Sequence, residues 1–377
     1  MACFSIAGKV LLENEFLPGI VTIDGDRISD CSAQGLREPS PQLESAYIAP
    51  GLIDLQANGG FGAEVGADPE AIRHLASRLP ETGVTSFLPT VITSPADYYP
   101  RVFEAFAAAK NAPGARALGL HLEGPFLSPQ RVGAHRAGLI EAADEELFAN
   151  LLSSAALRVM TLAPERSGAL DRIRRLKDRG VLVSLGHTDA TYEEFLAGID
   201  AGAAMATHLY NAMSPFRHRT PGAIGASLTD DRLTVGLIAD GVHSHPASLR
   251  LALRAKGADR IALVTDMMPA AGMPPGTYEF GGQAVTVDGS VATLQDGTLA
   301  GSIVPLDQAI RNVVRSTAAT PADAIRMASE TPACLLGLED RGRIASGCLA
   351  DLVLFDANLN VETTIIGGEI VYRRENL

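Results

Sequence analysis

The fold is first indicated by the stretch His121-Leu122-Glu123-Gly124-Pro125-Phe126, which places a carboxylate at the end of an apolar strand. The hydrophobic run 117–120 leads directly into this stretch, and the Gly-Pro pair then stops any strand. Glu123 is therefore expected at the junction of a strand and a loop. A carboxylate at such a junction can point into a cavity instead of being buried in a core.

Three more polar residues stand in the same kind of place. His187, His208 and Asp266 each follow a short apolar run that is typical of a buried strand. Together with Glu123 they supply two imidazoles and two carboxylates at the ends of four different strands. Such a set suits a divalent metal and its catalytic base.

Eight apolar runs alternate with helical patterns through the middle of the chain. The expected strands are 50–54, 84–88, 117–121, 157–162, 181–186, 203–207, 234–239 and 261–265. Most are nearly continuous apolar runs, as expected of parallel strands that are covered on both faces. This alternation predicts an α/β fold, a (β/α)₈ TIM-like barrel, in which the chemistry lies just past the carboxyl ends of the strands.

Helices and long loops fill the spaces between these strands. Two helices are expected to begin at Asp68-Pro69 and Ser94-Pro95, where a capping residue precedes proline. Residues 209–232 read as a long loop after the sixth strand. Residues 267–300 read as a glycine-rich β-hairpin excursion, followed by helices at 305–317 and 321–330. Long loops on this side of a barrel usually shape substrate binding.

The two chain ends have a different sequence pattern, in which short β-rich runs are joined by turns. Asp24-Gly25 lies between two such runs and predicts a hairpin, and Gly367-Gly368 predicts another. Neither end is long enough to bury a core by itself, so we expect both to combine into one small β-sandwich. The predicted organisation is residues 1–49 and 340–377 in the β-sandwich and 50–339 in the barrel.

The composition argues against several classes of protein. The net charge of −13 disfavours a nucleic-acid groove or an anionic membrane surface, since both favour a basic face. The four cysteines are scattered without a C-x-x-C pair, which is typical of a reduced cytosolic protein. The sequence shows neither a signal-peptide pattern nor an apolar run long enough to span a membrane, so we expect a cytoplasmic protein.

Glu123, His187 and His208 are the expected metal ligands, because their oxygen and nitrogen atoms suit zinc with one position left open for water. A single histidine in a barrel is more often a hydrogen-bonded structural residue. Here that alternative would have to hold for both histidines and the glutamate. Asp266 is a fourth ligand, a helix cap or, in the interpretation we prefer, a general base that takes a proton from the attacking water and passes it to the leaving group.

Six motifs stand at or beside these strand ends. They are Pro50-Gly51-Leu52-Ile53-Asp54, His121-Leu122-Glu123-Gly124-Pro125-Phe126, Leu185-Gly186-His187, Thr207-His208-Leu209-Tyr210-Asn211-Ala212-Met213, Asp240-Gly241-Val242-His243 and Thr265-Asp266. Over essentially the whole chain they resemble the N-acetylglucosamine-6-phosphate deacetylases of the amidohydrolase superfamily. The segment 347–353 is similar to the C-terminal β-sandwich signature of that superfamily.

The resemblance implies an enzyme that hydrolyses the acetamide of N-acetyl-D-glucosamine 6-phosphate to glucosamine 6-phosphate and acetate, in amino-sugar catabolism or recycling. It implies one divalent metal ion per chain, Zn²⁺ above all, on Glu123, His187 and His208, with Asp266 as the catalytic acid and base. It also implies a wider set of contacts to the sugar phosphate: Ala134, His135, Asn211, Ala212, Arg219, Asp240, His243, Leu299, Ala300 and Gly301. Within that set, the two histidines orient the substrate and stabilise its oxyanion.

The resemblance further implies a homodimer in which Arg219 reaches the phosphate of the neighbouring subunit's substrate. A guanidinium group is well suited to this task because it can form two parallel hydrogen bonds with a phosphate. On spacing alone, Arg219 is as readily explained as a solvated arginine on a loop.

Three positions depart from the family pattern. Gln56 and Asn58 stand where amidohydrolases commonly carry His-x-His for a second metal. Because amides are poor zinc ligands beside imidazoles, we expect a single metal ion. Phe126 stands where tryptophan is frequent, and Val132 stands where lysine is often found.

Three alternatives remain open at this point. One is a deacetylase of another phosphorylated N-acetyl hexosamine, such as N-acetylgalactosamine 6-phosphate. Another is a cyclic-amide hydrolase or an N-acyl amino-acid deacylase, which typically carries a lysine on the fourth strand that 157–165 lacks. The third is a non-catalytic sugar-phosphate-binding barrel, in which a metal ligand or Asp266 would be expected to be lost.

Overall fold

A computed structural model describes residues 3–32, 42–289 and 291–375. The expected N-terminal piece, residues 1–49, therefore includes residues 1–2 and 33–41, which lie outside the described part. None of the helices in the described ranges has the length and apolar character needed to cross a membrane.

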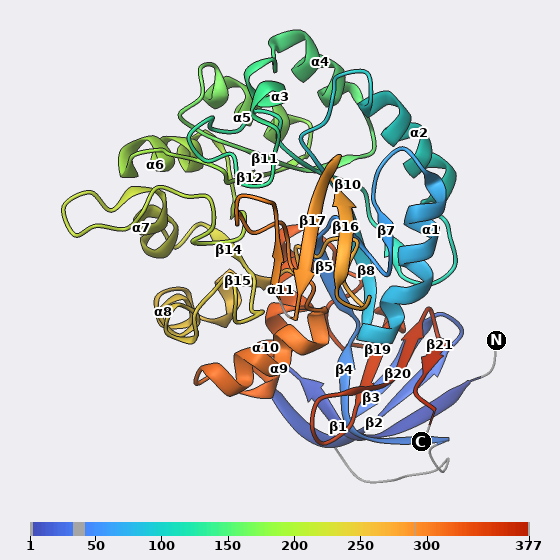
Figure 1. Cartoon of the computed structure of the whole chain (residues 1–377). Coiled ribbons are helices and arrows are strands. Elements are labelled where there is room, and N and C mark those ends of the chain that lie inside the picture. The colour runs from blue at the N-terminus through green and yellow to red at the C-terminus, as the bar shows by residue number, and fades with distance from the viewer. Residues whose placement is uncertain (1–2, 33–41, 290, 376–377) are drawn as a thin grey trace.

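A parallel barrel forms the centre of the molecule, and its strands follow the order expected from the sequence (Figure 1). Among the described residues, the barrel strands are β5 (Leu52–Ala57), β8 (Val84–Ile92), β10 (Leu120–Glu123), β11 (Leu157–Leu162), β12 (Leu182–Leu185), β13 (Met205–Ala206), β14 (Thr234–Leu237) and β15 (Ile261–Leu263). The short β9 (Arg116–Ala117) pairs with β8. A bridge from Ala57 to Met267 brings the two ends of the sheet together, so the predicted barrel fold is confirmed.

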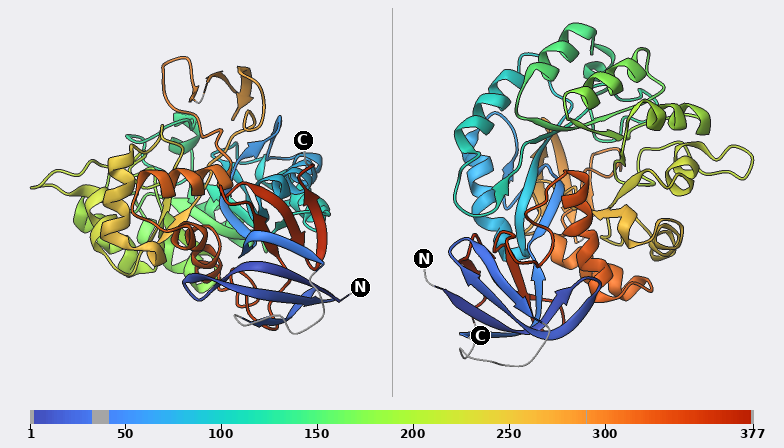
Figure 2. Two further views of the ribbon diagram at one scale, coloured as in Figure 1. Left: turned by 90° about the horizontal axis from the view of Figure 1, so that it is seen from below. Right: turned by 180° about the vertical axis from the view of Figure 1, so that it is seen from behind.

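Helices surround the barrel on the outside (Figure 2). In the described residues they are α1 (Pro69–Arg78), α2 (Tyr99–Ala109), α3 (Ala137–Glu141), α4 (Glu145–Ser153), α5 (Ala169–Asp178), α6 (Tyr192–Ala201), α7 (Gly222–Thr229), α8 (Pro246–Lys256), α9 (Leu306–Ser316), α10 (Pro321–Met327) and α11 (Glu330–Leu335). Short 3₁₀ segments lie at η1 (Leu79–Thr82) and η2 (Ala258–Arg260). The helix expected over 321–330 is α10, which ends at Met327, and a separate helix, α11, begins at Glu330.

One of the two predicted helix starts is confirmed and the other is wrong. Asp68 caps α1 by accepting the N–H of Glu70. The second helix, α2, begins at Tyr99 and not at Ser94-Pro95. Residues 95–98 form a turn instead, and Pro100 fits only the first turn of a helix because it lacks an N–H. This proline therefore fixes where α2 starts.

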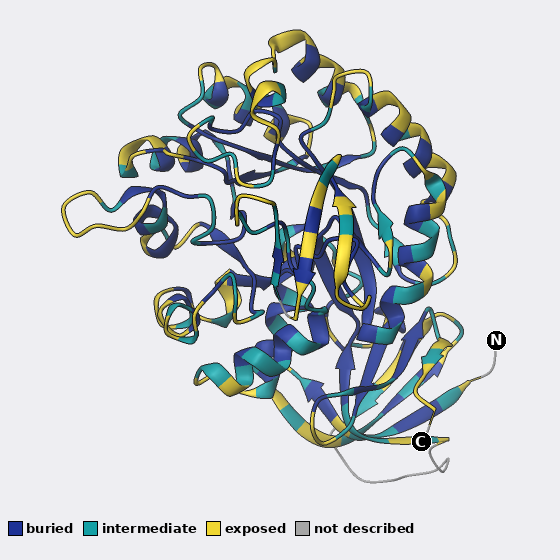
Figure 3. Ribbon diagram, in the orientation of Figure 1, coloured by how far each residue is buried: buried dark blue, intermediate teal, exposed yellow. Residues whose placement is uncertain are grey.

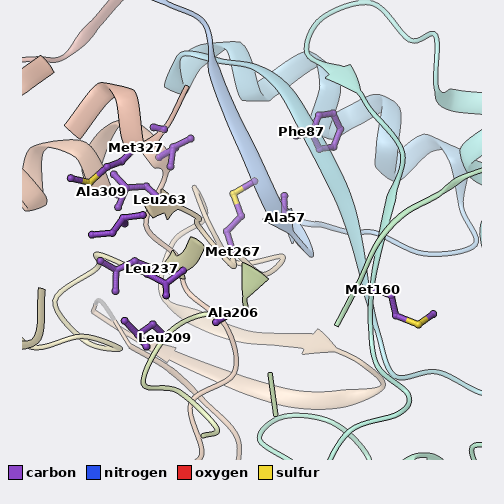
Figure 4. Packing of buried hydrophobic residues seen from close by; sticks show 14 of the residues in the cluster. Ala57, Phe87, Met160, Ala206, Leu209, Leu237, Leu263, Met267, Ala309 and Met327 are labelled. Atoms are coloured by element: carbon purple, nitrogen blue, oxygen red, sulfur yellow. The ribbon is translucent and has the colours of Figure 1, made fainter. Parts of the chain in front are cut away.

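Buried residues follow the barrel strands and the inner faces of the helices (Figure 3). Every residue of β8 is buried, as expected of a parallel strand covered on both faces. Leu263 of β15 lies beside Ala309 of α9 and Met327 of α10, which illustrates how the outer helices pack on the strands (Figure 4). This packing fixes the strand ends where the polar residues lie.

Both chain ends build one sheet beside the barrel. Its strands in the described residues are β1 (Phe4–Leu12), β2 (Glu15–Asp24), β3 (Arg27–Ser32), β4 (Leu43–Pro50), β19 (Leu352–Phe355), β20 (Val361–Ile366) and β21 (Glu369–Arg373). The sheet is curled (Figure 2). Ile23, Ile48 and Leu354, from three of its strands, belong to one apolar core. The expected joining of the two ends is confirmed, whereas the boundaries at 49/50 and 339/340 remain predictions.

An ion pair between a half-buried arginine and a buried aspartate connects this sheet to the barrel. Arg116 of β9 pairs with Asp351, whose side chain is 3% exposed and whose other oxygen accepts the N–H of Gly367 at 2.8 Å. The backbone carbonyl of Asp351 also accepts the N–H of Gly51 at 2.8 Å. The carboxylate therefore joins elements that are far apart in the sequence.

Replacing Asp351 with alanine is expected to lower the free energy of unfolding by about 1–3 kcal/mol, because it removes the partner of the half-buried Arg116 guanidinium and the acceptor of the Gly367 N–H. Asp351→Asn keeps an oxygen for Gly367 and should cost less. Urea denaturation measures both values. Equal stability of the alanine variant and the parent protein would contradict this assignment.

Two long segments lie over the carboxyl ends of the barrel strands. The excursion predicted over 267–300 is confirmed, and its strands are β16 (Gly276–Phe280), β17 (Gln283–Asp288) and β18 (Val291–Thr293); a smaller hairpin joins β6 (Gly59–Gly60) and β7 (Ala63–Glu64). In Figure 1, β16 and β17 cross in front of the barrel.

The expectation of a continuous loop over 209–232 is wrong, because this segment contains α7. Glycine and threonine in this helix have low helix propensity, but most of its residues are buried. Tertiary packing therefore overrides the local preference. Residues 215–220, just before α7, are all exposed and extend away from the barrel (Figure 1).

Candidate active site

The four polar residues expected at strand ends lie together in the structure. Glu123 is the last residue of β10, and the other three follow β12, β13 and β15 within three residues. His187, His208 and Asp266 have positive φ angles of 46°, 30° and 49°. Non-glycine residues rarely adopt this left-handed backbone, and such strain is concentrated at functional sites. It turns each side chain into the barrel mouth directly after its strand.

Glu123, His187 and His208 form a compact cluster of buried metal-ligand atoms. Glu123 Oε1 lies 3.2 Å from His187 Nε2 and 3.0 Å from His208 Nε2, and the two nitrogens are 3.1 Å apart. Ligand atoms about 2.0–2.2 Å from a tetrahedral zinc ion lie roughly 3.3 Å from one another. The donor set and its spacing therefore fit a divalent ion with nitrogen and oxygen ligands.

Hydrogen bonds around His187 and Glu123 hold both side chains in states that can bind a metal ion. His187 Nδ1 donates to the carbonyl of Arg131 at 2.8 Å, so its Nε2 keeps a lone pair that faces Glu123. Burial alone would raise the pKa of Glu123, but hydrogen bonds with His187 and His208 lower it well below its usual range. The carboxylate is thus ionised and available as a ligand.

Asp266 is held by two side-chain amides. Its Oδ1 accepts hydrogen bonds from Gln56 Nε2 at 2.9 Å and from Asn58 Nδ2 at 2.6 Å. Burial, and next the charge of Glu123, raise the pKa of Asp266 to about 6. Because both amides bind Oδ1, the other carboxylate oxygen is left for proton transfer.

The neighbour of Asp266 is anchored at the base of the site. Thr265 donates from its hydroxyl and its backbone N–H to the carboxylate of Asp54, which is fully buried. Burial, opposed by these hydrogen bonds, raises the pKa of Asp54 to about 6. The Pro-Gly-x-Ile-Asp motif therefore positions the residues that follow β15 from β5, the strand beside it where the barrel closes.

His135 faces the metal cluster as a hydrogen-bond donor. Its Nδ1 lies 2.8 Å from the Thr93 hydroxyl oxygen and accepts the backbone N–H of Thr93 at 3.2 Å. A backbone N–H can only donate, so with this pairing Nδ1 is the acceptor and the ring proton is on Nε2. Burial, and next the charge of His187, lower the pKa of His135 to about 3, so the ring is neutral. Its Nε2 lies 3.9 Å from Glu123 Oε2.

His243 has the opposite arrangement. Its Nδ1 donates to Asp240 Oδ2 at 2.6 Å, which leaves Nε2 as the ring nitrogen for a contact in the cavity. Asp240 Oδ1 accepts the backbone N–H groups of Val242 and His243. Burial alone would raise the pKa of Asp240, but the hydrogen bond with the His243 ring and these two backbone bonds lower it. Asp240 therefore acts on the cavity through His243.

A cavity of about 370 Å³ opens above these groups. The residues predicted to contact the sugar phosphate that line it are Ala134, His135, Asn211, Ala212, His243, Leu299 and Gly301. Phe280 of the β16–β17 excursion also lines the cavity. Among the described lining residues, Arg131 is the single lysine or arginine.

Three residues of the predicted contact set lie outside this cavity lining. Asp240 supports His243 from behind, and Ala300 is fully buried with its N–H donating to the carbonyl of Ala292 at 3.0 Å. Arg219 lies on the exposed segment 215–220, away from the cavity of its own chain. Its predicted role across a dimer remains a prediction.

Sequence analysis missed two residues that support the cavity. Thr93 follows the last residue of β8 directly, so the rule that finds functional residues at strand ends would have identified it. Gln283 on β17 donates from its amide to the carbonyl of Ala134 at 2.7 Å and holds the loop that carries His135. Nothing in the local sequence signals this contact.

Residues 47–371 match the sequence profile of the amidohydrolase family. The chain belongs to the amidohydrolase family.

Three curated relatives share much of its length. An N-acetylglucosamine-6-phosphate deacetylase of Bacillus subtilis (strain 168) is 42% identical, covering 96% of this chain and 95% of the relative. The enzyme of that name from Homo sapiens is 38% identical, covering 98% and 93%. An N-acetylgalactosamine-6-phosphate deacetylase of Escherichia coli O157:H7 is 41% identical, covering 88% and 91%.

Solved structures of amidohydrolases with these names have the same architecture. A mutant N-acetyl-D-glucosamine-6-phosphate deacetylase from Mycobacterium smegmatis, in complex with N-acetyl-D-glucosamine-6-phosphate, superposes with a TM-score of 0.93 at 34% identity, covering 98% of this chain and 100% of the other. The enzyme from Pasteurella multocida gives a TM-score of 0.91 at 30% identity, covering 98% and 99%. The amidohydrolase assignment therefore rests on both sequence and structure.

Proposed function

We propose that this chain hydrolyses the acetamide of N-acetyl-D-glucosamine 6-phosphate, giving glucosamine 6-phosphate and acetate. The observation that carries the proposal is the convergence of Glu123, His187 and His208 beside Asp266 at the base of a single cavity. Relatives about 40% identical over most of the chain bear the name of this activity. The test is acetate release from the phosphorylated sugar by the purified protein.

The chain's own residues suggest how the reaction would proceed. A divalent ion on the three ligands would supply a water of lowered pKa and would polarise the amide carbonyl. Asp266 accepts a proton from the attacking water on its free oxygen and passes it to the departing sugar amine. His135 donates from Nε2 to the carbonyl oxygen as negative charge develops there. His243 forms a hydrogen bond with a hydroxyl of the sugar through Nε2 and orients the sugar ring.

The phosphate of the substrate needs positive charge at the cavity rim. Arg131 lines the cavity, and its guanidinium is already oriented by a hydrogen bond of 2.8 Å with Asp189. We further propose a homodimer in which Arg219 of one subunit reaches the cavity of its partner. Phe216 beside it is 57% exposed, and aromatic and arginine side chains are typical anchors of protein interfaces.

We predict about one divalent ion per fully active chain, most simply Zn²⁺. Gln56 and Asn58 occupy the place of a second metal's ligands, and both of their amides are bound to Asp266. Elemental analysis of the purified protein measures the ratio, and Glu123→Ala should abolish tight retention. Two tightly held ions per chain, both needed for turnover, would contradict this prediction.

A second candidate substrate is N-acetylgalactosamine 6-phosphate, because one relative of 41% identity carries that name. Comparing kcat/KM for the two epimers and for unphosphorylated N-acetylglucosamine distinguishes these possibilities. Absence of acetate release from every sugar, with binding retained, would instead indicate a sugar-phosphate-binding barrel.

A further inference from the structure

A chain of buried hydrogen bonds crosses the barrel interior next to the proposed metal ligands. It runs from the Leu55 carbonyl to His121 Nδ1 at 3.0 Å, from His121 Nε2 to Thr161 Oγ1 at 2.8 Å, from Thr161 to Thr207 at 2.7 Å, and from Thr207 to Ser184 at 2.6 Å. The four side chains are at most 1% exposed. The proposed reaction uses none of them.

The direction of these hydrogen bonds follows from the acceptor at one end. The Leu55 carbonyl can only accept, so His121 Nδ1 donates to it, and Nε2 of the neutral ring accepts from Thr161. Thr161 then accepts from Thr207, which accepts from Ser184. Because the chain ends on a peptide carbonyl, it has no acceptor to which a proton can be delivered. It is therefore suited to holding strands in place and not to proton transfer.

Three of the four members lie close in sequence to a proposed metal ligand, and the fourth, Thr161 on β11, is the register partner of Glu123. His121 is two residues before Glu123 on β10, so both side chains are on the same face of that strand. Thr207 directly precedes His208, and Ser184 lies three residues before His187. The hydrogen bonds thus join the three ligand-bearing strands near the point where the ligands emerge.

The backbone alone gives little support at one of these strands. β13 consists of Met205–Ala206 and forms two register pairs with β12 and two with β14. His208 follows it almost immediately and has a positive φ. Side-chain bonds from Thr207 to Ser184 on the adjacent β12 and to Thr161 on β11 compensate for this short ladder.

Close packing fixes the orientation of the two threonines. A Cβ atom added to Gly186 would lie 2.7 Å from Thr207 Cβ and 3.1 Å from Thr161 Cγ2. Both threonines are therefore seated against this glycine. Their rotation is restricted, and their hydroxyl groups stay in the chain.

We infer that Thr161 and Thr207 are positioning residues, whose hydroxyl groups align Glu123, His187 and His208 for metal binding. This inference rests on the proposed function only in requiring a metal at these ligands. Removing a hydrogen bond that holds metal ligands in place, without itself touching the metal, typically weakens metal affinity by about 10- to 100-fold.

The test measures Zn²⁺ affinity of the metal-stripped full chain by competition with a chelator. Thr161→Val keeps the shape of the side chain but removes the hydroxyl, and we expect about 10- to 100-fold weaker binding. Thr161→Ser keeps the hydroxyl, so its Zn²⁺ affinity should stay within about threefold of that of the parent protein. This is a smaller change than the loss of a hydrogen bond that supports a metal ligand. Thr85→Val is the matched control, because Thr85 is a buried threonine on β8 whose hydroxyl donates only to the Leu52 carbonyl.

The outcomes separate the inference from the proposed function. If the parent protein does not bind Zn²⁺, the proposed metal-dependent function fails. If it binds Zn²⁺ and Thr161→Val binds equally well, or Thr85→Val loses as much affinity, the inference is overturned. Failure of Thr161→Ser to restore binding would also overturn it.

A second variant covers the case in which Thr161→Val does not fold, as judged by circular dichroism. Ser184→Ala removes only the last donor of the chain and leaves the Thr161–His121 bond in place. We expect it to weaken Zn²⁺ binding several-fold, toward the lower end of the range for hydrogen bonds that support metal ligands. Unchanged affinity in a folded Ser184→Ala protein would then overturn the inference.

Discussion

Replacing Asp266 with asparagine is expected to reduce turnover by about 10²- to 10⁴-fold, while the fold and the metal content stay unchanged. An amide cannot take a proton from water and return it to the sugar amine. Asparagine is the appropriate substitution because it tolerates the left-handed backbone at this position, where φ is 49°. Acetate release gives kcat, and elemental analysis gives the metal content of the same sample.

Asp68→Asn provides a matched control for this substitution. Asp68 caps α1 and does not line the cavity around Glu123, and asparagine is an equally good helix cap. It should therefore retain full activity. A near-normal kcat for Asp266→Asn would show that Asp266 has only a structural role, through its hydrogen bonds with Gln56 and Asn58.

The barrel and the cluster of Glu123, His187 and His208 could be predicted because both depend on local patterns. Strands buried on two faces must be apolar along their length, as β8 is, and the fold rule then places the residue after each strand at the active face. Glu123, His187 and His208 were found in this way. The Asp24-Gly25 hairpin was similarly visible, because glycine supplies the positive φ that the turn requires.

The remaining features depend on contacts between residues that are distant in sequence. Gln56 and Asn58 were noted as substitutions for histidine, but their bonds to Asp266 span more than two hundred residues. The protonated nitrogen of His135 depends on contacts with Thr93, which follows β8 and is 42 residues away in sequence. Helix α7 forms through burial, although its composition favours a loop. A single sequence carries no local signal for such pairings.

Arg219→Ala is expected to raise KM for the phosphorylated sugar by about 10- to 100-fold, which corresponds to the loss of a hydrogen bond to a charged group worth about 1.5–3 kcal/mol. KM for the unphosphorylated sugar should change far less, because that sugar has no phosphate to lose a partner. Arg217→Ala is the matched control, since Arg217 lies on the same exposed segment. An equal effect of both substitutions would indicate a general electrostatic contribution.

Mixed dimers test whether Arg219 acts on the partner's cavity. Co-expressing Arg219→Ala chains with Asp266→Asn chains gives some dimers in which one site contains an intact Asp266 and receives an intact arginine from the other chain. If the arginine acts across the interface, that site regains normal KM and turnover, although each parent variant is defective alone. If Arg219 acts within its own chain, every site lacks either the base or the arginine, so mixing restores nothing and the dimer proposal fails.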